Sequence, residues 1–166
     1  MNQTEEIERN EIIGYAKRIL PIKSISPESG GKGEGERADE ICKILDEMGR
    51  KNYTRYDTKD KSGSIRSNIV LKIGNTERTL WLISHIDTVP EGDKTLWTKE
   101  PFAATIEGDK IYGRGSSDDC QAVFLSLMLA KRIKEGSLRY NLGLAFVADE
   151  ELGSVYGIQY LLKQGI

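Results

Sequence analysis

The stretch TLWLISHIDTVP, residues 79–90, contains the only histidine of the chain, His85. The apolar run that opens this stretch is short and bounded by turn residues, which predicts a buried β-strand. Because side chains two residues apart on a strand share a face, His85 and Asp87 are expected to point the same way at its carboxyl end. An imidazole with a nearby carboxylate suits a metal ligand and the group that orients it. A lone histidine is more often a structural residue, and this stretch alone leaves that alternative open.

Two further clusters of acidic residues follow along the chain. The glycine-rich segment Gly113–Asp119 presents Asp118 and Asp119 just before a predicted helix, where a carboxylate can also serve as a helix cap. The second cluster, Asp149–Glu151, ends an apolar run, and adjacent acids at such a place are also typical of a solvated loop. Paired carboxylates repel a phosphate, so a functional interpretation of either cluster requires a cation.

The three clusters together are more informative than any one of them. His85, Asp118 and Glu151 are evenly spaced along the chain, which leaves room for one supersecondary unit between neighbours. Imidazole and carboxylate groups coordinate zinc, manganese or cobalt, and the set lacks the thiolates of a purely structural site. Two such ions about 3.5–4 Å apart, bridged by a carboxylate, activate water for hydrolysis. The joint pattern therefore predicts a hydrolytic metal centre.

Apolar periodicity predicts helices that alternate with strands. The expected helices are residues 4–20, with Thr4 as the N-cap, and residues 36–48, 119–135 and 154–163. The expected strands are residues 53–56, 68–73, 79–84, 103–106, 110–112 and 141–148. This alternation favours the α/β class, in a three-layer α/β/α arrangement with a mixed, mostly parallel sheet. A length of 166 residues fits one domain.

Charge and cysteine content exclude several classes of partner. The chain has 24 Lys and Arg against 26 Asp and Glu, for a net charge of −2, so no long-range positive field recruits nucleic acid or anionic lipid. Cys42 and Cys120 are too few for a disulfide framework, which favours a reducing compartment. We therefore expect a cytoplasmic protein that binds a small molecule, with no nucleic-acid and no membrane partner.

Three motifs, in order, resemble the signatures of one family. They are His85-x-Asp87-Thr88-Val89-Pro90, then Tyr112-Gly113-Arg114-Gly115-x-x-Asp118-Asp119, then Asp149-Glu150-Glu151-Leu152-Gly153. The family is that of the zinc-dependent aminoacylases and carboxypeptidase G-like metallopeptidases, which includes acetylornithine deacetylase and succinyl-diaminopimelate desuccinylase. The resemblance implies a zinc-exopeptidase-like fold and hydrolysis of the amide bond of an N-acyl amino acid or short peptide.

The resemblance also implies a role for each site residue. His85 would bind one Zn²⁺, Asp118 would bridge two, and Glu151 would bind the second, with Co²⁺ or Mn²⁺ as substitutes. Glu150 would be the general base that takes a proton from zinc-bound water, and Asp87 would hold the His85 ring in its ligand tautomer. This division agrees with the chemistry, because a ligating carboxylate has its charge committed to the metal and a free neighbour must handle the proton.

The chain also departs from the family pattern. The family has five metal-ligand positions, of which three are matched, and its lid and dimerisation domain has no counterpart here. We therefore expect residues 1–166 to be the N-terminal portion of a single catalytic domain, C-terminally incomplete and inactive alone, from a full-length homodimer. Cys120-Gln121 stands where the family usually has lysine and glycine. We expect the catalytic interpretation to hold, and these departures motivate an alternative, a non-catalytic binding or assembly module that keeps the fold.

Overall fold

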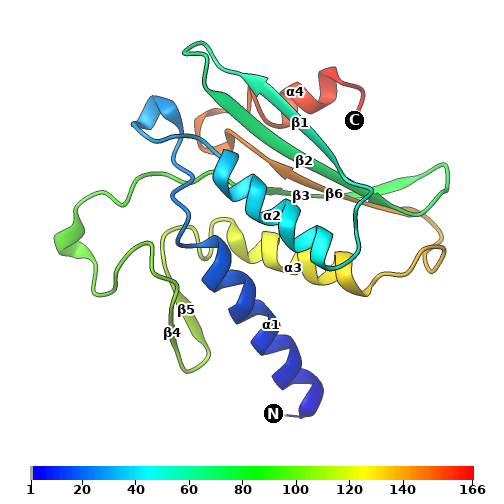
Figure 1. Cartoon of the computed structure of the whole chain (residues 1–166), viewed down its shortest axis with the longest axis horizontal. Coiled ribbons are helices and arrows are strands. Elements are labelled where there is room, and N and C mark those ends of the chain that lie inside the picture. Colours follow the sequence, from blue (N-terminus) through cyan, green and yellow to red (C-terminus); the bar gives the residue numbers. More distant parts are fainter. Residues whose placement is uncertain (1) are drawn as a thin grey trace.

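A computed structural model describes residues 2–166 and places four strands in one sheet, in the order β1-β2-β6-β3 (Figure 1). These strands are β1 Thr54–Lys59, β2 Ile65–Ile73, β3 Thr79–His85 and β6 Asn141–Val147, and a separate hairpin pairs β4 Thr105–Glu107 with β5 Lys110–Tyr112. The helices are α1 Gln3–Ile19, α2 Gly35–Glu47, α3 Cys120–Arg132 and α4 Ile158–Lys163, with 3-10 helices at Pro27–Ser29, Lys94–Leu96 and Glu150–Leu152. Within residues 2–166, none of the helices has the length and apolar character that crossing a membrane requires.

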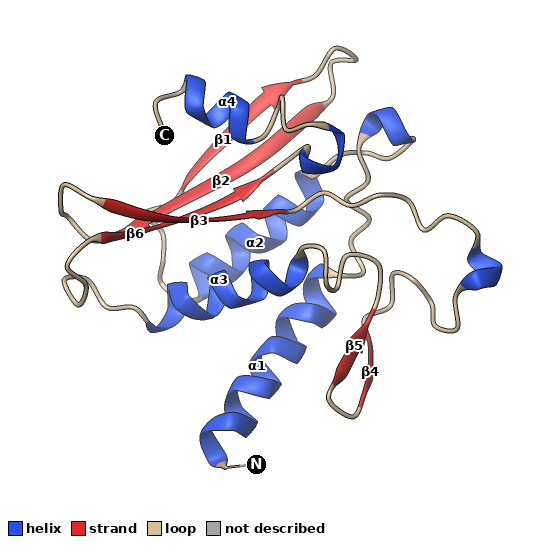
Figure 2. Ribbon diagram, turned by 180° about the vertical axis from the view of Figure 1, so that it is seen from behind, coloured by secondary structure: helices blue, strands red, loops and turns tan. Residues whose placement is uncertain are grey.

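The two faces of the sheet carry separate apolar cores. Alternate residues of a strand point to opposite faces, so Leu71 and Leu144 pack in the larger core with α1, α2 and α3. Val70 and Ala145 lie on the other face, against Leu161 of α4. Figure 2 shows α2 and α3 on one side of the sheet and α4 on the other. The expected three-layer α/β/α arrangement is therefore confirmed.

The expectation of a mostly parallel sheet is wrong for the described strands. Only the pair β3–β6 is parallel, whereas β1–β2 and β2–β6 are antiparallel. The β1–β2 turn is closed by Asp60, whose carboxylate accepts the backbone N–H groups of Ser62 and Ser64, and so short a connection can join only antiparallel strands. The parallel pair is connected through α3, the long crossover that parallel strands require.

Element ends differ from the sequence expectations by a few residues. The N-cap of α1 is Asn2 rather than Thr4, because Asn2 and Glu5 exchange side-chain and backbone hydrogen bonds in a capping box. The last helix is shorter than predicted and begins at Ile158. Ser154 has a left-handed φ of 61°, which an α-helix cannot contain.

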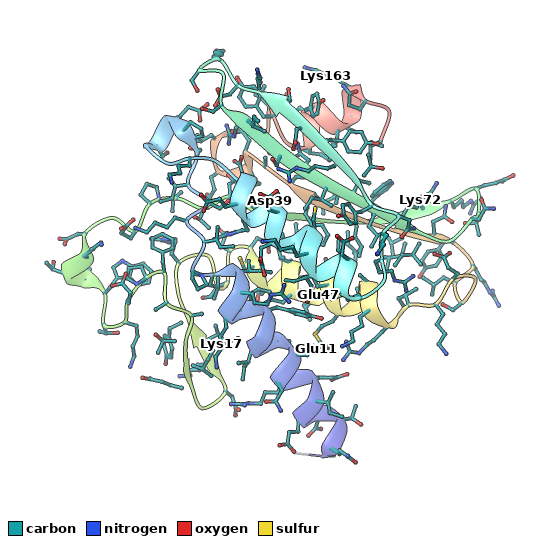
Figure 3. The ribbon with its side chains drawn as sticks, viewed as in Figure 1. Glu11, Lys17, Asp39, Glu47, Lys72 and Lys163 are labelled. Atoms are coloured by element: carbon teal, nitrogen blue, oxygen red, sulfur yellow. The ribbon has the colours of Figure 1, made fainter. Side chains whose placement is uncertain are left out.

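The outward faces of α1 and α2 carry charges of both signs. Figure 3 labels Glu11 and Lys17 on α1 and Asp39 and Glu47 on α2. Arg18 of α1 donates to Glu47 at 2.6 Å, so ion pairs join the two helices at their surface. Exposed pairs of this kind contribute about 0.2–1 kcal/mol each, and the buried apolar residues therefore account for most of the helix packing.

The carboxyl ends of β3 and β6 lie side by side. His85 is opposite Val147 in the parallel register, and the N–H of Ile86 donates to the Val147 carbonyl at 2.8 Å. The segments that follow these two strands therefore leave the sheet at the same edge, where open α/β sheets place their ligands. The turn before α3 comes to the same place, since the carboxylate of Asp119 accepts the His85 N–H at 3.2 Å.

Candidate metal centre

Three connections converge at this edge of the sheet. His85 is the last residue of β3, Asp118 lies in the turn before α3, and Glu151 lies in the 3-10 helix after β6. One ligand atom from each side chain lies within 4.8 Å of the other two. The structure thus brings together the three residues that the sequence predicts as metal ligands.

The His85 ring is buried, with 6% of the residue exposed, and both ring nitrogens have partners. Nε2 lies 2.9 Å from Oδ1 of Asp118. Nδ1 lies 3.1 Å from the backbone carbonyl of Asp87 and 3.4 Å from its carboxylate. Burial lowers the pKa of His85, but the hydrogen bonds to Asp87 and Asp118 outweigh it and raise the pKa to about 9. Because Asp87 occupies Nδ1, Nε2 is the ring nitrogen that faces Asp118.

Asp87 connects the imidazole to the two glutamates. Its side chain is buried, and its two oxygens accept the backbone N–H groups of Glu150 and Glu151, each at 3.1 Å. The sequence predicts Asp87 beside the His85 ring, and the structure places it there. Its second contact, with the glutamate turn, was not predicted from the sequence. A single buried carboxylate therefore holds two of the three converging connections together.

The side chains of Glu150 and Glu151 differ in their surroundings. Oε2 of Glu150 lies 3.8 Å from Nε2 of His85, and its side chain is 53% exposed. Burial raises the pKa of Glu151, His85 opposes the rise, and the charges of Asp118, Asp87 and Glu150 add to it. Acids crowded in this way are stabilised by a bound cation.

The donor set fits a divalent ion of the zinc type. It combines one imidazole with carboxylate oxygens, which zinc, cobalt and manganese accept. Cys120 contributes no thiolate, because it is fully buried, although its sulfur lies 3.7 Å from a guanidinium nitrogen of Arg37. Burial raises the pKa of the Cys120 thiol although Arg37 opposes this. Cys120 is thus a buried residue beside the site, where it packs as a small apolar side chain.

Sequence reasoning missed the contribution of Asp119. Its carboxylate accepts the backbone N–H of His85, and burial raises its pKa. The adjacent pair Asp118-Asp119 could have indicated this contact in the sequence. Adjacent residues of a turn point in different directions, so only one of the two can face the ligand cluster. Asp118 does so, and Asp119 instead fixes the end of β3.

In this α/β domain, imidazole and carboxylate groups that could hold a metal ion gather at the carboxyl ends of strands β3 and β6. Residues 81–166 match the model of Peptidase family M20/M25/M40. The chain belongs to this family, which confirms the resemblance found in the three motifs.

Individual relatives agree with this assignment. The chain is 46% identical over 162 residues to an uncharacterized metallohydrolase of Methanocaldococcus jannaschii, covering 92% of the chain and 40% of the relative. It is 30% identical over 160 residues to a succinyl-diaminopimelate desuccinylase of Rickettsia felis, with the same coverage of each. An M20 family metallo-carboxypeptidase from Sulfolobus solfataricus superposes with a TM-score of 0.65 at 26% identity, covering 93% of the chain and 32% of that structure. The chain thus spans about 40% of the length of these curated relatives.

Proposed function

We propose that the full-length protein is a zinc-dependent hydrolase that cleaves the amide bond of an N-acyl amino acid or short peptide. Residues 1–166 would supply the N-terminal portion of its catalytic domain. Family membership and the similarity to a desuccinylase and a metallo-carboxypeptidase support the reaction class. The observation that carries the proposal is the convergence of His85, Asp118 and Glu151, with ligand atoms within 4.8 Å of one another.

His85, Asp118 and Glu151 would hold the metal. Asp118 suits the bridging position, because its Oδ1 faces His85 while its Oδ2 has no hydrogen bond within residues 2–166 and its side chain is 80% exposed. Zinc supplies Lewis acidity toward the scissile carbonyl and toward water. Asp87 keeps Nδ1 of His85 engaged, which directs Nε2 toward the metal position.

Glu150 is proposed as the general base that accepts a proton from the attacking water and later returns it to the leaving amine. Its side chain is exposed and lies 3.8 Å from Nε2 of His85, so it borders the ligand cluster. Its backbone N–H is fixed by Asp87, but its carboxylate has no Lys or Arg partner within residues 2–166. A carboxylate that is close to the metal position and has no permanent cation beside it suits proton transfer.

The remaining proposals concern the complete protein. Three ligands are too few for two zinc ions, so residues outside this chain would complete the site, and the chain alone is proposed to be inactive. The full-length protein is proposed to be a homodimer in the cytoplasm. Both cysteines are free and buried, which supports a reducing compartment.

Metal titration of the 166-residue chain tests the proposal. Binding of Co²⁺ is followed by its visible absorption, and binding of Zn²⁺ is measured by competition with a chelator. We expect one weakly held ion per chain and about tenfold or greater loss of affinity in His85→Ala. Asp109→Asn serves as the control, because Asp109 lies on the β4–β5 turn and its side chain is 95% exposed; it should bind as the wild type does.

Equal affinity of His85→Ala and the wild type would contradict the proposed site. Absence of binding together with an inactive full-length protein would favour the non-catalytic module. Two tightly held ions per chain would contradict the proposal that residues outside this chain complete the coordination of the metal.

A further inference from the structure

A buried ion-pair cluster lies behind the turn that carries Glu150 and Glu151. Arg66 of β2 is fully buried, and its Nε and Nη2 donate to Glu34 at 2.9 and 2.6 Å. The same Nη2 lies 3.2 Å from Oδ1 of Asp149, the residue directly before the two glutamates. The planar fork of an arginine can hold two carboxylates at once in a fixed geometry.

Asp149 forms the corner of this turn. Its φ of 65° is in the left-handed region, which residues other than glycine seldom adopt. Its Oδ2 accepts the N–H of Tyr156 at 3.0 Å, and its carbonyl accepts the N–H of Ser154 at 2.6 Å. Only 2% of Asp149 is exposed, so without Arg66 its charge would be buried and unpaired. The corner therefore depends on the guanidinium.

The opposite side of the turn is held by Asp87. The Asp87 carboxylate accepts the N–H groups of Glu150 and Glu151, which follow the corner, whereas Arg66 contacts the corner itself. These two contacts come from β2 and from the segment after β3, and they fix both ends of one short segment. Together they determine the direction in which the two glutamate side chains leave the backbone.

We propose that Arg66 is a positioning residue of the metal centre. Through Asp149 it holds the turn in the conformation that directs Glu151 toward His85 and Asp118. Glu34 acts one step further away, because it takes two donors of the guanidinium and so fixes its orientation. This role rests on the proposed function, since a turn positioned for metal binding presupposes a metal centre.

Two variants test the contact between Arg66 and Asp149. Asp149→Asn keeps the shape of the side chain and an oxygen for the Tyr156 N–H, but removes the charge that faces Arg66. Arg66→Lys keeps a buried cation but loses the fork. The matched control is Glu28→Gln: Glu28 also contacts Arg66, at 3.3 Å, but its side chain is 48% exposed and lies outside the turn.

Co²⁺ affinity and the visible Co²⁺ spectrum are measured on the 166-residue chain, with circular dichroism to verify folding. We expect Asp149→Asn and Arg66→Lys to bind Co²⁺ about 10–100-fold more weakly, with an altered spectrum, because partners of ligand-bearing segments have effects of this size. Glu28→Gln is expected to match the wild type in both measurements.

Unchanged affinity and spectrum in both variants, with His85→Ala impaired, would overturn the positioning role and leave the proposed function standing. An equal loss in Glu28→Gln would also overturn it, because the loss would then reflect the cluster as a whole rather than the turn. If His85→Ala binds Co²⁺ as the wild type does, the proposed function and the positioning role both fail. If Asp149→Asn does not fold, Arg66→Lys decides the question.

Discussion

Two groups of carboxylates flank the Glu150–Glu151 turn and are neutralised in different ways. The Arg66 cluster, defined as Arg66, Glu34 and Asp149, contains its own buried cation. The metal-ligand edge, defined as His85, Asp118 and Glu151, has no Lys or Arg side chain paired with its acids within residues 2–166. A built-in guanidinium provides a fixed support, whereas acids without one leave a place for an exchangeable cation. The fixed support and the proposed metal site are therefore formed by different residues.

The largest effect is expected from Glu150→Gln in the full-length protein. The amide keeps the size of the side chain but cannot accept a proton, so kcat should fall about 10²–10⁴-fold. Bound metal, measured by elemental analysis, should be unchanged because Glu150 is not proposed as a ligand. An unchanged kcat would remove Glu150 from the base role.

Arg66→Met tests how much the Arg66 cluster contributes to the free energy of unfolding. It leaves the buried carboxylates of Glu34 and Asp149 without a cation, and removal of one partner from a buried pair destabilises a protein by about 3–5 kcal/mol. Urea unfolding of the metal-free chain measures this. Asp118→Asn at the metal-ligand edge should lower the free energy of unfolding by only about 0.2–1 kcal/mol, because its side chain is 80% exposed and solvent screens its pair with His85. Similar losses of unfolding free energy in Arg66→Met and Asp118→Asn would contradict the proposed difference between the Arg66 cluster and the metal-ligand edge.

Asp87→Asn is expected to affect both properties at an intermediate level. One backbone N–H of the Glu150–Glu151 turn would face an amide donor in place of a carboxylate oxygen, which should lower stability by about 1–3 kcal/mol. Metal affinity should fall about 10–100-fold, because the His85 ring also loses its charged neighbour. Chelator competition and urea unfolding, performed on the same preparation, measure the two effects. A loss of stability with unchanged affinity would restrict Asp87 to a structural role.

The smallest expected effect is the release of a proton from His85 when Zn²⁺ binds. In the metal-free chain the pKa of His85 is raised to about 9, so the ring carries a proton at about pH 7.5 and must lose it to become a ligand. Calorimetric titration with Zn²⁺ in buffers of different ionisation enthalpy should therefore show about one proton released near neutral pH, and fewer as the pH rises through 9. Release that does not change with pH would exclude His85 as its source.

The residues of the metal-ligand edge could be predicted from the sequence because they lie in local motifs next to apolar runs. Apolar runs locate β3 and β6, and the residues that follow parallel neighbours meet at one edge of the sheet. That is why His85 and Glu151 could be predicted to lie together, whereas Asp118, in the turn before α3, was added through the joint pattern of the three motifs. Their roles in binding and catalysis remain predictions.

The Arg66 cluster was not accessible in the same way. The predicted strand began at Asn68, whereas β2 begins at Ile65, because Arg66 and Ser67 suggest a solvated segment when taken alone. The burial of Arg66 depends on Glu34, which lies outside the sheet and far away in the sequence. The antiparallel pairing of β2 with β6 is likewise a long-range choice that apolar patterns do not reveal.

Anomalous diffraction from crystals of the chain soaked with Zn²⁺ would show directly whether these residues bind a metal. We expect a zinc peak in contact with Nε2 of His85 and the carboxylate of Asp118, beside Glu151. A zinc peak only at other residues, or no peak at this edge when the soak saturates other sites, would contradict the assignment of these residues to a metal centre.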